Sequence, residues 1–169
     1  MSHLTVLGID PGTAVTGYGV VRQDGTKLTA LDYGCVRTDS KASLPHRLLK
    51  LYRELSALIG RFSPDAVAVE QIFFNRNVRS ALAVGQARGV ALLAAARADV
   101  PVLEYTPLEV KQAVVGYGRA DKCQVQRMVM AVLRLPETPA PDDVADALAV
   151  AVCCLHSRAT RRRWEGEGA

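Results

Sequence analysis

Leu4-Thr5-Val6-Leu7-Gly8-Ile9, followed by Asp10-Pro11-Gly12, is the stretch that decides the fold. A short, nearly continuous apolar run that ends at a turn signal predicts a strand buried on both faces. Residues 17–22 and 28–36 are predicted to form two further strands, because the hairpin signal Asp24-Gly25 lies between them. The chain therefore opens with an antiparallel meander whose first strand ends in an acid.

Helices and strands alternate after this meander. Apolar residues recur at helical spacing over residues 43–62, with Ser43 as the predicted N-cap. Residues 66–69 predict a strand that ends at Glu70 and returns parallel to the first strand. A helix rich in Ala and Gly over residues 77–98 and a short strand over residues 101–105 follow. This alternation is typical of a βαβ crossover.

Three more helices complete the predicted fold. Thr106 and Asp121 each begin a capping-box pattern, and a last helix runs from about Asp142 to about Ser157. The order βββαβαβααα predicts the α/β class, with a mixed sheet of about five strands flanked by helices. The length prior of roughly 100–200 residues per domain predicts one domain over residues 1–157. Residues 158–169 are predicted to be a basic, flexible tail that includes three consecutive arginines.

Composition limits the class of protein. The 169 residues include 21 basic and 17 acidic side chains, which give a net charge of +4, and 49% of residues are hydrophobic. These values exclude collagen-like, disordered and coiled-coil classes. The chain shows no signal-peptide pattern and no apolar run of the ~18 residues that a membrane span needs, so we expect a cytoplasmic protein without a membrane partner. The 4 cysteines lack C-x-x-C spacing and are expected to be reduced core thiols.

Acids occur where a buried core is predicted. Asp10 and Glu70 end two strands predicted to be parallel neighbours, so their carboxylates should meet at one edge of the sheet. Asp143 and Asp146 are three residues apart and share a face of the apolar last helix. Ionised carboxylates this close share a proton or hold a cation, and oxygen donors without His or Cys suit Mg²⁺ or Mn²⁺. The pattern predicts two-metal phosphoryl chemistry, with ions ~3.5–4 Å apart.

Each acid alone also has a structural explanation. Asp10 before Pro-Gly fits a turn, and Glu70 fits a strand end in solvent. Asp142 and Asp143 both fit a helix start, and Asp142 lies four residues before Asp146, so spacing does not choose between them. Asp146 has the weakest structural explanation because neither a cap nor a solvated face accounts for an acid in an apolar segment. The combination of acids therefore favours a metal site.

The order of the motifs adds a family resemblance. The sequence closely resembles the RuvC family of bacterial Holliday junction resolvases over roughly Thr5 to His156, in the motifs Gly8-Ile9-Asp10-Pro11-Gly12-Thr13, Val69-Glu70-Gln71-Ile72-Phe73, Gly85-Gln86-Ala87-Arg88-Gly89, Val110-Lys111-Gln112 and Asp143-Val144-Ala145-Asp146-Ala147-Leu148-Ala149. The resemblance implies a ribonuclease H-like fold, a homodimer, and Mg²⁺-dependent paired nicking of four-way DNA junctions in recombination and repair. It also implies Mn²⁺ as a substitute, two ions per active site, and the branch-migration partners RuvA and RuvB.

The resemblance also implies roles for individual residues. The catalytic, metal-binding acids of the family match Asp10, Glu70, Asp143 and Asp146, which selects Asp143 over Asp142. Some relatives have His at the third of these positions, where this chain has Asp.

DNA-contact residues are predicted beside these acids. The segment from Gln71 to Ala98 holds four arginines, among them Arg76 and Arg79, and no acid. A solvated helix face is the ordinary explanation, but a positive segment next to a proposed metal site favours phosphate binding.

The family supplies three more expectations. The resemblance implies DNA handling by Lys111 and Lys122, and stacking or wedging of junction bases by Phe73. It assigns the small-residue helix to the dimer interface, although this helix would also fit simple packing on the sheet.

Two rival functions remain open to comparison. The Gly8–Thr13 motif is also similar to the first phosphate loop of actin-like sugar kinases and chaperones, but those proteins need two large domains and this chain has 169 residues. A non-enzymatic ribonuclease H-like factor would be favoured by the loss of one acid, and all four positions are filled.

Overall fold

One mixed sheet organises the chain, and the computed structural model describes residues 3–72 and 78–157. The sheet has five strands in the order β3-β2-β1-β4-β5. Strand β1 is antiparallel to β2 and parallel to β4. The strands are β1 (His3–Asp10), β2 (Val15–Asp24), β3 (Lys27–Arg37), β4 (Ala66–Glu70) and β5 (Val102–Tyr105). The predicted mixed sheet and the element order βββαβαβααα are confirmed.

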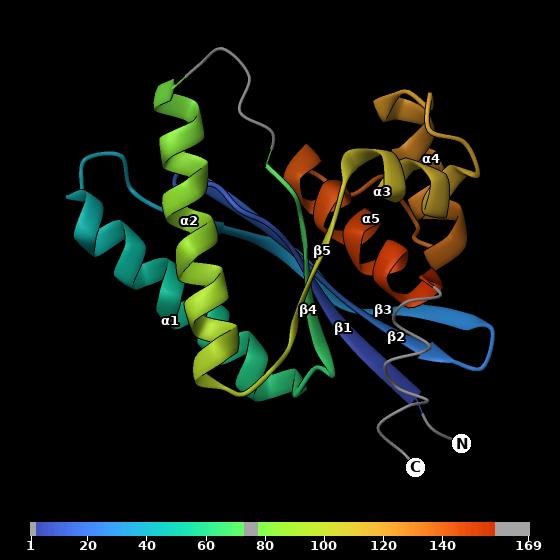
Figure 1. The fold of residues 1–169 in the computed structure, drawn as a ribbon, viewed down its shortest axis with the longest axis horizontal. Coiled ribbons are helices and arrows are strands. Elements are labelled where there is room, and N and C mark those ends of the chain that lie inside the picture. Colours follow the sequence, from blue (N-terminus) through green and yellow to red (C-terminus); the bar gives the residue numbers. More distant parts are fainter. Residues whose placement is uncertain (1–2, 73–77, 158–169) are drawn as a thin grey trace.

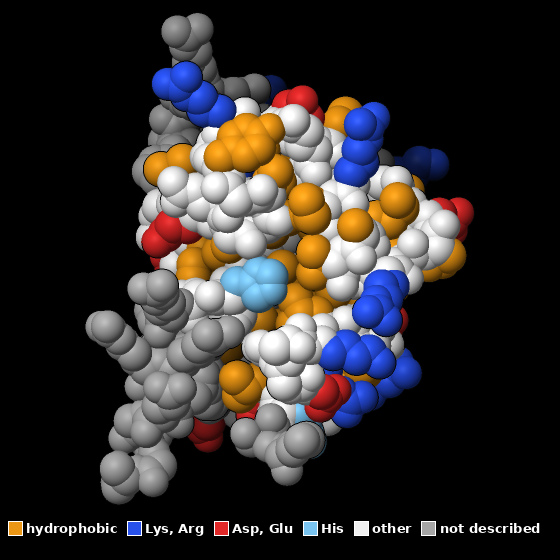
Figure 2. All heavy atoms as spheres, turned by 90° about the vertical axis from the view of Figure 1, so that its right-hand side faces the viewer, with side chains coloured by type: hydrophobic (Ala, Val, Ile, Leu, Met, Phe, Trp, Pro, Cys, Tyr) orange, Lys and Arg blue, Asp and Glu red, His pale blue; other side chains and the backbone are white. Residues whose placement is uncertain are grey.

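Helices cover both faces of this sheet (Figure 1). Helices α1 and α2 lie on one face, and α3, α4 and α5 lie on the other. Their bounds are α1 (Leu44–Phe62), α2 (Val78–Arg97), α3 (Pro107–Val115), α4 (Lys122–Leu133) and α5 (Asp142–His156). Figure 2 looks onto the α3–α5 side, where apolar side chains lie near the centre and Lys and Arg side chains lie around the margin.

The period-two pattern of a strand explains how each face is filled. In β1, Leu7 and Ile9 belong to the core beneath α1 and α2, whereas Val6 belongs to the core beneath α5. In β4, Val67 and Val69 lie on the α1–α2 face, and the alternate alanines lie on the α5 face. The residues that end these two strands therefore continue the α5 face.

Local helix signals are largely confirmed. Thr106 and Asp121 both form complete capping boxes, in which the cap side chain and the third helical side chain each accept a backbone N–H. Ser43 occupies the predicted N-cap position of α1, but its side chain makes no capping bond and instead lies 2.7 Å from Nδ1 of His46.

Other expectations have different outcomes. The four cysteines are all thiols, and Cys153 and Cys154 are buried as expected, but Cys123 is exposed in the first turn of α4, so its assignment to the core is wrong. Within the described ranges, no helix is long and apolar enough to cross a membrane. The predicted tail, residues 158–169, lies outside the described residues.

Candidate active site

Two strand ends begin the site. Ile9 and Val69 are the last paired residues of the parallel β1–β4 ladder. Asp10 and Glu70 are the next residue of each strand, and both are half-buried. Because the two strands are parallel neighbours, their carboxyl ends meet at the same edge of the sheet. The predicted juxtaposition of Asp10 and Glu70 is therefore a feature of the fold.

Glycines on the sheet bring helix α5 to this edge. Gly17 pairs with Asp10, and Gly8 pairs with Gly19. A Cβ atom at Gly17 would overlap the main-chain carbonyl of Asp143, and one at Gly8 would overlap the carbonyl of Ala147. The backbone of α5 thus packs directly on the strands, because these positions carry no side chain.

This close approach adds the remaining two acids. Asp143 and Asp146 lie on α5 among residues that are almost all buried, and both are themselves half-buried. The strand glycines supply the room for this close packing. The spacing Gly17-Tyr18-Gly19 in a predicted strand was the signal that could have revealed it.

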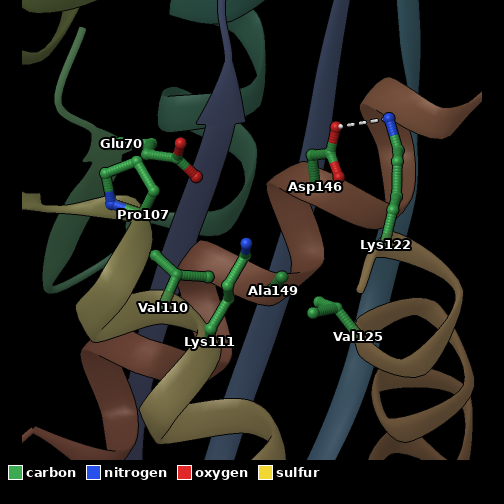
Figure 3. Close-up of a pocket in the computed structure, with 8 residues that line it drawn as sticks. All are labelled: Glu70, Pro107, Val110, Lys111, Lys122, Val125, Asp146 and Ala149. Carbon is green, nitrogen blue, oxygen red and sulfur yellow. Dashed lines mark ion pairs between the residues drawn. The ribbon is translucent and has the colours of Figure 1, made fainter. Parts of the chain in front are cut away.

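Two adjoining cavities open above the acids. One has a volume of about 310 Å³ and is lined by Asp10, Glu70 and Asp146, together with Val84 of α2. The other, of about 300 Å³, shares Glu70 and Asp146. Figure 3 shows the second cavity, which Glu70 and Asp146 both line, with the carboxylate of Asp146 directed toward Nζ of Lys122. The site is therefore an open, acid-lined hollow at the sheet edge.

Crowding perturbs the acids. Burial, followed by the charges of Asp146, Asp143 and Glu70, raises the pKa of Asp10 to about 7. Burial is also the largest cause that raises the pKa of Glu70 and of Asp146. Carboxyl groups that resist ionisation because they are buried and lie near like charges are groups that a bound cation would stabilise as carboxylates. The electrostatics of the site therefore fit a cation site made of oxygen donors.

Lys122 partly offsets this negative charge. Its Nζ lies 3.1 Å from Oδ2 of Asp142 and 3.4 Å from Oδ2 of Asp146. In the described part of the chain, no three His, Cys, Asp or Glu side chains are already arranged to hold a metal ion. A metal ion bound by Asp146 would compete with the contact between Lys122 and Asp146.

Asp142 and Asp143 differ in their exposure and in the charges that they affect. Asp142 is exposed, and its hydrogen bonds from Lys122 and Gln126 lower its pKa. Asp143 contributes to the raised pKa of Asp10, and Asp142 is not among the causes. The structure therefore favours Asp143 as the partner of Asp10, a choice that residue spacing left open.

The predicted DNA-contact residues have different positions. Lys111 and Lys122 both line the acid-lined cavity, and the charge of Lys111 partly offsets the burial that raises the pKa of Glu70. Arg79 is exposed in the first turn of α2. Phe73 and Arg76 lie outside the described residues. Arg88, which lies in the quoted motif Gly85-Gln86-Ala87-Arg88-Gly89 and in the positive segment, is mostly buried and donates a hydrogen bond to the main-chain carbonyl of Glu70.

These features define a class of protein first. A mixed sheet in this order, with acids at the ends of its two central parallel strands and on the helix that crosses it, is a ribonuclease H-like fold with an acidic site. The yeast mitochondrial Holliday junction resolvase Ydc2 shares this fold, with a TM-score of 0.65 and 14% identity over 96% of this chain and 83% of that one.

Sequence comparison then identifies the family. The family model for the crossover junction endodeoxyribonuclease RuvC matches residues 6–154, and the chain belongs to this family. RuvC of Heliobacterium modesticaldum is 60% identical over 154 residues, covering 91% of this chain and 95% of that protein. RuvC of Desulfitobacterium hafniense is 58% identical over 91% of this chain and 93% of its own length. T. thermophilus RuvC, solved in complex with Holliday junction substrate, superposes with a TM-score of 0.88 and 40% identity over 94% and 96% of the two chains.

Proposed function

We propose that this chain is a crossover junction endodeoxyribonuclease that resolves four-way (Holliday) DNA junctions by paired, symmetric nicks in homologous recombination and repair. The observation that carries the proposal is the gathering of four acids at one sheet edge, where burial, followed by the charges of Asp146, Asp143 and Glu70, raises the pKa of Asp10 to about 7. Family membership and the 40% identity to a RuvC solved with its junction substrate support the same activity.

The acids fit divalent metal ions. Asp10, Glu70, Asp143 and Asp146 offer hard oxygen donors. Burial and neighbouring carboxylates raise the pKa of Asp10, Glu70 and Asp146, so a bound cation would stabilise their ionised forms. We propose that they hold two Mg²⁺ ions, with Mn²⁺ as a substitute. Bound ions would supply an activated water and stabilise the leaving oxygen of the phosphodiester. The chain's own contribution is to fix these four carboxylates through β1, β4 and the close-packed α5.

The basic residues near the acids would bind the DNA backbone. Lys111 and Lys122 extend from α3 and α4 into the acid-lined cavity (Figure 3), where a phosphate would approach. Arg79 would add a contact from the first turn of α2. Contacts from Phe73 and Arg76 stay predictions.

The proposed assembly is a homodimer formed through α2. This helix buries Ala87 and Ala91 on one side, while Leu82 and Leu93, on the opposite side, are 61% and 59% exposed. A two-fold dimer would present two active sites to symmetry-related strands of a junction. RuvA and RuvB as partners and a cytoplasmic location stay predictions.

The test is Asp146→Asn in a nicking assay with labelled synthetic four-way DNA and linear duplex, with and without Mg²⁺. We expect no nicking of the junction by this variant, while binding of the junction remains measurable. Asp142→Asn is the matched control, since Asp142 is exposed one turn away and its variant should still cut. Unchanged cleavage by Asp146→Asn would reject the metal site, and equal cutting of both DNAs by the unmodified protein would reject junction selectivity.

A further inference from the structure

Arg88 joins three elements behind the site. Its side chain is 13% exposed and lies in the middle of α2. Nη1 donates a hydrogen bond of 2.8 Å to the main-chain carbonyl of Glu70, at the end of β4. Nη2 lies 2.5 Å from Oε1 of Glu104, on β5. One guanidinium therefore ties α2 to the ends of two strands.

The contact to Glu70 lies just beyond the point where β4 stops pairing with β1. The β1–β4 ladder ends at Val69, so Glu70 lies one residue beyond it. On the other side, Glu70 pairs with Tyr105, and the N–H of Gln71 donates to the carbonyl of Tyr105. Arg88 supplies a restraint to the Glu70 carbonyl from α2. Fixing this carbonyl limits rotation of the Glu70 backbone and so limits the direction of its side chain.

Arginine is the residue that can make both contacts at once. Its planar guanidinium carries a fixed fork of donors and keeps its charge, so one arm can pair with a carboxylate while the other donates to a carbonyl. Lysine has a single ammonium centre on a flexible stem and cannot reproduce this fork. Glu104 provides the countercharge that makes a mostly buried guanidinium tolerable.

We propose that Arg88 is a positioning residue that sets the direction of the Glu70 carboxylate for metal binding. The inference rests on the proposed function, in which Glu70 is a metal ligand. Arg88 is not among the residues that line the two cavities described above, and its contact with their lining is the hydrogen bond to the main-chain carbonyl of Glu70. Groups that orient a metal ligand in this way typically change metal affinity by about 10–100-fold when they are removed.

The experiment is a titration of the DNA-free protein with Mn²⁺, followed by electron paramagnetic resonance. Arg88→Met should weaken Mn²⁺ binding about tenfold. Arg97→Met is the matched control, because it removes the same charge from an exposed position in the last turn of the same helix, and it should bind Mn²⁺ normally. Junction binding in EDTA should be unchanged in Arg88→Met, and the Mg²⁺ concentration for half-maximal nicking should rise.

A second variant, Arg88→Lys, allows the test to be made even if Arg88→Met does not fold. Circular dichroism in EDTA will show whether Arg88→Met is folded, and Arg88→Lys, which can reach one partner at a time, should give an intermediate Mn²⁺ affinity. Wild-type Mn²⁺ affinity in a folded Arg88→Met, or in Arg88→Lys if the first variant does not fold, overturns the proposal.

Glu70→Gln separates this proposal from the proposed function. If Glu70→Gln loses Mn²⁺ affinity while Arg88→Met keeps it, only the role of Arg88 is wrong. If Glu70→Gln binds Mn²⁺ like the wild type, the metal site itself is wrong and the role of Arg88 falls with it.

Discussion

The two faces of the sheet are packed in different ways. On one face, α5 lies with its backbone against glycines of β1 and β2, and every residue from Val144 to Leu155 except Asp146 is buried. On the other face, α2 contacts the core through small alanines, and Leu82 and Leu93 stay largely exposed. The first face is filled by the chain itself, whereas the second leaves an apolar helix surface uncovered.

The two faces have different roles: the α5 face positions the acids, and we propose that the outer side of α2 serves association. Backbone-to-backbone packing leaves no flexible side chain between α5 and the strands, so Asp143 and Asp146 are held as firmly as the sheet residue Asp10. We propose association for the exposed apolar side of α2 because burying it requires a second surface. We therefore expect substitutions beneath α5 to affect folding and cleavage together, and substitutions on the outer side of α2 to affect assembly.

Gly17→Ala should disrupt the packing of α5 on the sheet and have the largest effect on stability and cleavage. The added methyl would overlap the carbonyl of Asp143, and neither backbone can yield cheaply. We expect the free energy of unfolding to fall by about 3 kcal/mol or more, with loss of junction nicking. Urea denaturation and a nicking assay measure both. Gly60→Ala in α1, where a Cβ would meet nothing within 4 Å, is the control; equal stability of the two variants would contradict close packing of α5.

Asp10→Asn should change how the free energy of unfolding depends on pH. The pKa of Asp10 is about 7 in the folded, metal-free protein, against an ordinary value of 3.8. The folded state therefore binds this proton more tightly, so its stabilising effect is complete below the lower value and is lost as pH rises through about 7. At pH values above that, Asn should raise the free energy of unfolding by at most about 4 kcal/mol.

Thermal unfolding in EDTA from acidic to mildly alkaline pH measures this effect. The wild-type Tm should decline across the range relative to that of Asp10→Asn. Asp24→Asn, at an exposed strand end, is the control and should follow the wild type. Parallel curves for Asp10→Asn and the wild type would show that neither burial nor the neighbouring acids raise the pKa of Asp10.

Sequence reasoning succeeded where the deciding contacts are local. The capping boxes at Thr106 and Asp121 were predictable because each involves residues three positions apart. The meeting of Asp10 and Glu70 followed from two parallel strands that end together. Both cases depend on periodicity or on neighbours along the chain.

Sequence reasoning could not predict features that depend on contacts between residues far apart in the sequence. Spacing alone left Asp142 and Asp143 equivalent, whereas in the fold Asp142 is exposed and Asp143 is half-buried and contributes to the raised pKa of Asp10. Arg88 looked like one of several solvated arginines, yet its partners come from β4 and β5. The room beneath α5 likewise depends on Gly17, which lies in the opening meander far from Asp143 in sequence.

Leu82→Glu should weaken the proposed dimer that forms through α2. Leu82 is 61% exposed, so the folded monomer should tolerate Glu. In a two-fold dimer the new charges would face each other or be buried, at a cost of several kcal/mol, so the dimer Kd should rise about a hundredfold or more. Sedimentation equilibrium measures it. Leu108→Glu, at a 54% exposed position on α3, should leave the dimer intact; a similar loss in both variants would argue against α2 as the interface.

Gly85→Ala gives the smallest effect and the sharpest comparison. Gly85 is exposed within α2, three residues after Leu82, and a Cβ there would meet nothing within 4 Å in the single chain. Alanine in an exposed helix interior is more favourable than glycine by about 0.8–1 kcal/mol. In the monomeric Leu82→Glu background, Gly85→Ala should therefore raise the free energy of unfolding by that amount, as measured in urea. In the otherwise wild-type dimer, the added methyl would hold the two helices apart and cancel the gain. An equal gain in both backgrounds would show that Gly85 faces solvent in the assembled protein and that the dimer uses another surface.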